Sequence, residues 1–191
     1  VTECFMDEIA GIAGKDPLQM RLELLSGKPR HKAVLELAAE KFGWGQKLPE
    51  RHAGGLAVHS SFGSFVAQAA EVSIAENKIR VHRVVCAVDC GIAVDPDQVA
   101  AQMESAVVFG LTAALKSGIS VRNGRVEQAN FHDFELLRHD EMPLVETHLV
   151  TSYVDPSGVG EPGVPPIAAA VANAVYKLTG VMPRKLPIEL E

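Results

Sequence analysis

The 191 residues are enough for one domain, or two small ones, with a substantial apolar core. A hydrophobic content of 47% and a charged content of 22% are typical of a soluble globular protein, and the net charge of −6 argues against a nucleic-acid partner, because duplex binders present a basic face. No apolar run has the length of a membrane span, and the first residues carry neither a signal-peptide pattern nor a twin arginine.

The first residues predict a helical lead-in segment over residues 1–45. Apolar spacing predicts a helix over residues 2–13, with an apolar stripe made of Phe5, Ile9 and Ile12. Asp16-Pro17 is a cap followed by a first-turn proline and starts a second helix, and a third runs over residues 31–42. We expect these helices to pack on a sheet and assign them no chemistry.

From residue 54 to residue 191 the pattern predicts a sheet-and-helix core. Strand signals run over residues 54–74, with a bend or bulge at Phe62-Gly63-Ser64, and again over residues 78–88 and 143–150. Asn123-Gly124 predicts a tight hairpin. The fold class is therefore α+β: a helical N-terminal segment, a mixed sheet and two helices that carry the candidate site.

The first of those two helices begins at the cap Asp95-Pro96 and extends to about Leu115. Gln102 borders its apolar stripe. A long amide in that position is either a solvated flanking residue or a donor and acceptor directed into a buried polar site. Periodicity alone favours the solvated interpretation.

The second site helix follows a loop of glycines and prolines, residues 153–166, and ends near Gly180. A glycine-rich loop that leads into a helix N-terminus directs free N–H groups and a positive dipole end at whatever lies in front. The same field should favour an ionised Glu161. A fixed carboxylate beside an anion-binding loop is what a general base in a phosphate-anchored cofactor site requires. An ordinary surface loop with a solvated glutamate is the competing interpretation.

The segment Gly158-Val159-Gly160-Glu161-Pro162-Gly163 resembles the catalytic-glutamate loop of the molybdenum hydroxylases, the xanthine dehydrogenase and aldehyde oxidoreductase family. The segment 101–106 resembles the family's cofactor-contacting glutamine segment, with Ser105 where the family usually has glycine. The resemblance covers almost the whole chain, which is most similar to the C-terminal portion of the large (beta) subunit in the isoquinoline 1-oxidoreductase branch.

This resemblance implies an oxidoreductase that hydroxylates a carbon beside a ring nitrogen, or oxidises an aldehyde, with water as the oxygen source. Glu161 would be the general base, while Gln102, Gly158, Val159 and Gly160 would contact a molybdenum–pterin dinucleotide of the cytosine form. We assign no metal-ligating residue. One cofactor must reach both Gln102 and Glu161, so the two site helices should approach one another.

Partners follow from what the chain lacks. Its three cysteines, Cys4, Cys86 and Cys90, cannot ligate an iron–sulfur cluster, which normally takes four thiolates, so electrons must leave through an iron–sulfur subunit or domain. The seven histidines form no HExxH pair. The chain starts at Val1, and we interpret it as a piece of a longer polypeptide whose upstream half completes the cofactor site. Its compartment, cytoplasm or periplasm, stays open.

Two other interpretations remain. The 191 residues could be a scaffold portion with no activity alone, and we expect the isolated piece to be inactive and to bind no cofactor. Alternatively, Asp155 and Glu161 could form the acid/base pair of a hydrolase, although nothing else in the chain resembles a glycosidase. His132 and Asp133 are adjacent on an extended segment and therefore point to opposite faces, so we interpret them as structural.

Overall fold

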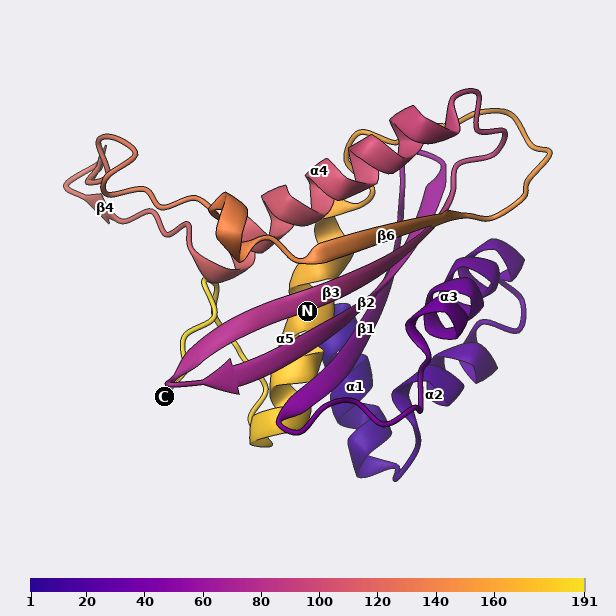
Figure 1. Ribbon diagram of the computed structural model, residues 1–191, viewed down its shortest axis with the longest axis horizontal. Coiled ribbons are helices and arrows are strands. Elements are labelled where there is room, and N and C mark those ends of the chain that lie inside the picture. The colour runs from indigo at the N-terminus through magenta and orange to yellow at the C-terminus, as the bar shows by residue number, and fades with distance from the viewer. Residues whose placement is uncertain (191) are drawn as a thin grey trace.

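The computed structural model describes residues 1–190 as helices packed on both faces of a mixed sheet (Figure 1). This confirms the α+β class. The helices are α1 (Thr2–Ile12), α2 (Pro17–Leu24), α3 (Pro29–Phe42), α4 (Pro96–Leu115) and α5 (Val164–Thr179), with a 3-10 turn η1 (His139–Glu141). The strands are β1 (His52–Ser61), β2 (Ser64–Ala75), β3 (Lys78–Asp89), β4 (Val121–Arg122), β5 (Arg125–Val126) and β6 (Leu144–Leu149).

The main sheet has the strand order β1-β2-β3-β6. β1, β2 and β3 form an antiparallel meander, and β6 then pairs with β3 in parallel. The β1–β2 turn and the carboxyl ends of β3 and β6 therefore lie at one edge of the sheet, because Phe65 pairs with Asp89 and Leu149 pairs with Val88. The small β4–β5 hairpin extends away from the body (Figure 1).

Alternation along the strands divides the core between the two faces of the sheet. On β3, Val84 and Cys86 face the α4 and α5 side, whereas Val85 and Ala87 face α3. The C-terminal half of β3, from Val84 on, is buried on both faces, as its apolar run predicts. Gly55 on β1 lets α5 come close, because a Cβ there would lie 2.1 Å from the Ala170 carbonyl oxygen.

Local chain signals account for most element boundaries. The Asp16 carboxylate accepts the N–H groups of Leu18 and Gln19 at the start of α2, and the Asp95 carboxylate accepts that of Gln98 at the start of α4. Gly180 ends α5 in the left-handed conformation. No helix among residues 1–190 is long and apolar enough to cross a membrane.

Two details differ from expectation. The predicted bend at residues 62–64 is a two-residue hairpin turn, in which Phe62 (φ 53°) and Gly63 (φ 81°) are both left-handed. The predicted apolar stripe of α1 is also wrong, because Phe5 is 57% and Ile12 is 88% exposed. The helix instead buries Ala10 and Asp7.

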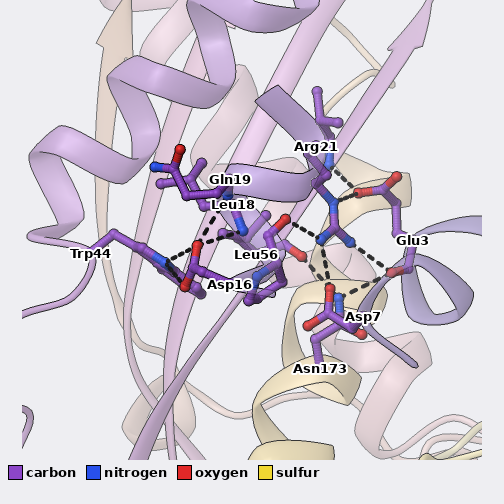
Figure 2. Close-up of polar contacts among 11 residues, drawn as sticks. Glu3, Asp7, Asp16, Leu18, Gln19, Arg21, Trp44, Leu56 and Asn173 are labelled. Atoms are coloured by element: carbon purple, nitrogen blue, oxygen red, sulfur yellow. Dashed lines mark hydrogen bonds and ion pairs between the residues drawn. The ribbon is translucent and has the colours of Figure 1, made fainter. Parts of the chain in front are cut away.

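A polar cluster explains the orientation of α1 (Figure 2). The buried Arg21 guanidinium forms ion pairs with Glu3 and Asp7, at 3.0 and 2.7 Å. Glu3 also accepts the Val58 N–H of edge strand β1 at 2.9 Å, and the Asn173 amide of α5 donates to the Leu56 carbonyl at the same distance. Rotating α1 toward its apolar residues would leave a buried cation without partners, which costs more than exposing Phe5.

Candidate functional site

The glutamate loop, residues 150–163, connects β6 to α5 and rests on two backbone seats at one edge of the sheet. The first seat is the last residue of β3 and the segment after it, Asp89–Ile92. The Cys90 carbonyl accepts both the N–H and the hydroxyl of Ser157, at 2.9 and 3.0 Å, and the Ile92 N–H donates to the Val154 carbonyl at 3.0 Å. Gly91 is in the left-handed region (φ 75°), and a Cβ there would lie 2.2 Å from the Asp155 carbonyl oxygen.

The second seat is the β1–β2 turn, Phe62–Ser64. The Phe62 carbonyl accepts the Gly158 N–H at 3.3 Å. The buried Ser64 hydroxyl donates to the Gly158 carbonyl at 2.6 Å and lies 2.8 Å from the Ser157 hydroxyl oxygen. Both seats hold the loop through its backbone, so its path is fixed immediately before Val159, Gly160 and Glu161.

The end of the loop is fixed in a different way. Gly163 packs directly on α4, since a Cβ there would lie 2.8 Å from the Ala106 Cβ and 3.1 Å from the Met103 sulfur. On its other side, the Gly163 carbonyl accepts the side-chain amide of the buried Gln68 at 2.8 Å. The expected approach of the two site helices is therefore confirmed, and it occurs at Gly163 and Ala106.

Glu161 and Gln102 are both exposed and lie on the two partners of this contact. Glu161 is two residues before Gly163. Gln102 is one helical turn before Ala106, so the two share a side of α4. The Gly163–Ala106 contact therefore forms a helix–loop junction that brings together the two segments that carry Glu161 and Gln102, and both residues are exposed.

The N–H groups in front of Glu161 differ from the simple helix-terminus picture. The first turn of α5 offers none, because the Val164 N–H donates to the Glu161 carbonyl at 2.9 Å and the next two residues are prolines. The Gly158 N–H is used by Phe62. Within residues 1–190, Val159 and Gly160 donate to no protein acceptor, and the space beside the Gly160 Cα is open. The N–H groups of Glu161 and Gly163 likewise have no protein acceptor, but Gly163 is buried. The accessible part of the loop therefore offers an anion the amides of Val159, Gly160 and Glu161.

The buried cysteines and Asp133 have structural surroundings and form no metal site. Burial raises the pKa of the Cys86 thiol to about 12 and also raises that of Cys90, so both stay protonated. The Asp133 carboxylate accepts the Ala129 and Asn130 N–H groups in a local turn. Residues 1–190 contain no group of three or more acidic, cysteine or histidine side chains arranged for a metal.

Three cavities on the described part of the chain lie away from Glu161 and Gln102. One of about 680 Å³ lies between the β2–β3 turn, the end of α4 and the C-terminal segment. A second is beside the β4–β5 hairpin. A third, of about 590 Å³, is an apolar groove on the outer side of α4 that includes Phe109, Leu136 and Met142. The junction is thus an open surface in this chain.

The donors at this junction can serve an anionic, dinucleotide-type ligand. The free amides of the loop and the exposed Gln102 side chain are hydrogen-bond donors, and Gly160 permits close backbone approach. Comparison with known protein families identifies a family that binds an anionic cofactor. Residues 20–143 match the family model described as the molybdopterin cofactor-binding domain. The chain belongs to this family.

Two relatives match along almost the whole chain. The isoquinoline 1-oxidoreductase subunit beta of Brevundimonas diminuta is 36% identical over 97% of this chain and 24% of its own length. The membrane-bound aldehyde dehydrogenase [pyrroloquinoline-quinone] of Gluconacetobacter polyoxogenes is 33% identical over 97% of this chain and 27% of its own length. The chain thus spans about a quarter of these relatives.

A solved structure supports the same architecture. Quinoline 2-oxidoreductase from Pseudomonas putida 86 superposes with a TM-score of 0.60 at 20% identity, over 65% of this chain and 17% of that one. At this identity the likeness concerns the fold alone.

Sequence reasoning missed the residues that hold the loop. Ser64 and Gln68 lie on β2, 94 and 95 residues before their loop partners Gly158 and Gly163. Neither residue belongs to a local motif. The available signal was weak: Gly63 and Gly91 each sit at a strand end, where a left-handed turn or a close backbone approach is expected.

Proposed function

We propose that this chain supplies the general base and part of the cofactor contact of a molybdenum-dependent oxidoreductase, which hydroxylates an N-heteroaromatic carbon or oxidises an aldehyde. The observation that supports this most is the glutamate loop itself. Its backbone is held on both sides of the carboxylate while Glu161 stays exposed, at the contact that also presents Gln102. A rigid backbone that carries an exposed carboxylate suits a base that must meet a substrate at a fixed position.

The residues have separate roles in this proposal. Val159 and Gly160 donate their N–H groups to the anionic part of a molybdenum–pterin dinucleotide, of the cytosine form, and Gln102 donates its amide near the metal end. Gly158 contributes through its backbone position, since its own N–H is engaged with Phe62. When bound, the molybdenum centre accepts the two electrons that the substrate carbon loses.

Glu161 has the proton-transfer role. Hydroxylation of a carbon by water releases two protons and two electrons: RH + H₂O → ROH + 2H⁺ + 2e⁻. The Glu161 carboxylate takes a proton from the oxygen that attacks the carbon, which makes that oxygen a stronger nucleophile. The electrons leave through an iron–sulfur partner, because the described residues contain no set of four thiolates.

The exposed junction also favours a second candidate. None of the three cavities described above is lined by Glu161 or Gln102. A scaffold role, in which another part of the polypeptide provides the chemistry, is compatible with this. The two candidates differ in whether Glu161 is needed for turnover.

Elemental analysis and oxygen labelling of the full subunit test the reaction class. We expect one molybdenum per subunit, and product oxygen derived from ¹⁸O-labelled water. The metal measurement is informative because one relative is named for a different cofactor, pyrroloquinoline-quinone. Turnover by a subunit without molybdenum, or product oxygen derived from O₂, would contradict the proposal.

A further inference from the structure

Arg30, in the first turn of α3, binds both seats of the glutamate loop. Its Nε and Nη2 each lie 2.7 Å from one oxygen of the Asp89 carboxylate, and its Nη1 donates to the Gly63 carbonyl at 3.2 Å. The side chain of Asp89 is 3% exposed and that of Arg30 is 31% exposed. A two-bond arginine–carboxylate pair fixes geometry as well as charge. One guanidinium therefore joins the end of β3 to the β1–β2 turn.

Asp89 extends this hold along the first seat. Its Oδ1 also accepts the Gly91 N–H at 3.0 Å, and Gly91 lies directly against the Asp155 carbonyl. Burial raises the pKa of the Asp89 carboxyl, but the hydrogen bonds from Arg30 and from the Gly91 N–H outweigh it and leave the pKa below its usual range. The carboxylate is ionised and has a donor on each oxygen.

Arg30 binds the second seat through the backbone of the β1–β2 turn. Gly63 is next to Phe62, whose carbonyl accepts the Gly158 N–H, and a Cβ on Gly63 would lie 3.1 Å from the Ser157 Cβ. The Arg30 guanidinium also stacks 4.3 Å from the centre of the Phe65 ring, at the start of β2. Planar stacking and a fork of donors are properties that lysine lacks.

We propose that Arg30 is a positioning residue for Glu161, acting through Asp89 and the two seats on residues 154–158 of the loop. The inference rests on the proposed function of Glu161, which Arg30 itself does not touch. Losing the guanidinium fork releases both seats at once, so the carboxylate and the Val159 and Gly160 amides lose their shared alignment. The helical lead-in segment thereby helps to position the proposed base.

Arg83 on β3 provides a matched control. Its side chain is 28% exposed, it pairs with Glu146 through two nitrogens, and it donates to the carbonyls of Lys41 and Phe42. It also lies over an aromatic ring, that of Phe42, at 5.7 Å. Both arginines tie α3 to the sheet with similar chemistry, but Arg83 does so at the far end of α3, away from the loop.

The experiment compares Arg30→Lys and Arg83→Lys in the full holoenzyme. We expect Arg30→Lys to lower kcat by roughly ten-fold or more, as a displaced catalytic group does, with KM and molybdenum content little changed. Amide hydrogen exchange at Ser157 and Gly158, whose N–H groups bind the two seats, should accelerate several-fold, because local opening of the loop becomes easier. Arg83→Lys should leave both readouts at the wild-type level.

Equal kcat and equal loop exchange in the two variants would overturn the inference. If Arg30→Lys does not fold, Asp89→Asn keeps the shape, removes the charge and should reproduce the same changes. Glu161→Gln separates the two claims: if that variant keeps full turnover, the proposed function fails, whereas the exchange measurement still decides whether Arg30 holds the loop.

Discussion

Gly91 is the residue at which one methyl group would disturb the loop most directly. It has a φ of 75°, and a Cβ would lie 2.2 Å from the Asp155 carbonyl oxygen and 2.7 Å from that of Val154. Gly124, in the β4–β5 hairpin, has the same φ but nothing within 4 Å of its Cβ position. The two glycines therefore share a backbone conformation and differ in their surroundings.

This pair gives a stability prediction. Gly124→Ala should lower the free energy of unfolding by about 1–2 kcal/mol, the cost of a left-handed alanine. Gly91→Ala should add the cost of a forced contact, roughly 1–3 kcal/mol more. Urea unfolding of both variants measures the difference. Equal losses of unfolding free energy in the two variants would show that the loop moves away from the new methyl group without cost, which would contradict a fixed loop backbone at Asp155.

At the same scale, the sequence could indicate the glutamate but not its support. Gly158, Gly160 and the prolines around Glu161 form a local pattern, so a fixed loop before a helix was predictable. The partners Ser64 and Gln68 depend on the register of β2 against the end of β3, which no local pattern sets. The free N–H groups expected in the first turn of α5 are also absent, because Pro165 and Pro166 carry no N–H.

At the scale of elements, the Glu3–Asp7–Arg21 cluster fixes α1 and α2 against β1 and α5 (Figure 2). Burial raises the pKa of Asp7 to about 6, even though the neighbouring Arg21 lowers it. The folded protein therefore binds this proton more tightly than the unfolded chain, whose pKa is near 3.8. The resulting stability is complete below the unfolded pKa and is lost as the pH rises through about 6.

The expected pH dependence follows from that sign. Between pH 7 and pH 5 the Asp7 carboxyl should add about 1 kcal/mol to the free energy of unfolding. Asp7→Asn cannot titrate and should lack this increment, while the rest of the pH profile stays the same. Urea midpoints at the two pH values measure it. Parallel pH profiles for wild type and Asp7→Asn would show that Arg21 keeps the carboxyl ionised throughout.

Helices were easier to predict than turns and faces. Asp16-Pro17 and Asp95-Pro96 combine a cap with a first-turn proline, and both start helices as expected. At Phe62-Gly63 a bend or bulge was predicted in the right place, but its form, a hairpin turn, was not. Phenylalanine rarely adopts a left-handed φ, whereas Asn123-Gly124 has the usual hairpin residues. The buried face of α1 was predicted wrongly because its ion pairs with Arg21, on the next helix, determine which residues are buried.

At the scale of the whole molecule, the order of the strands creates the site. β6 returns beside β3 in parallel, so it delivers the glutamate loop to the edge that already holds the β1–β2 turn and the start of α4. The α+β class was predictable from the succession of helical and strand patterns. The strand order was not, because pairing β6 with β3 across more than fifty residues is a long-range choice.

The central claim is that Glu161 is the base, and the most direct measurement is the turnover of Glu161→Gln in the full subunit, with molybdenum content measured on the same sample. The amide keeps the shape and loses the base, so kcat should fall by about 10²–10⁴ while molybdenum is retained. Asp155→Asn, in the same loop, is the matched control and should keep near-wild-type turnover. A Glu161→Gln enzyme that works within a few-fold of wild type would contradict the account, and an equal loss in both variants would favour a carboxylate pair instead.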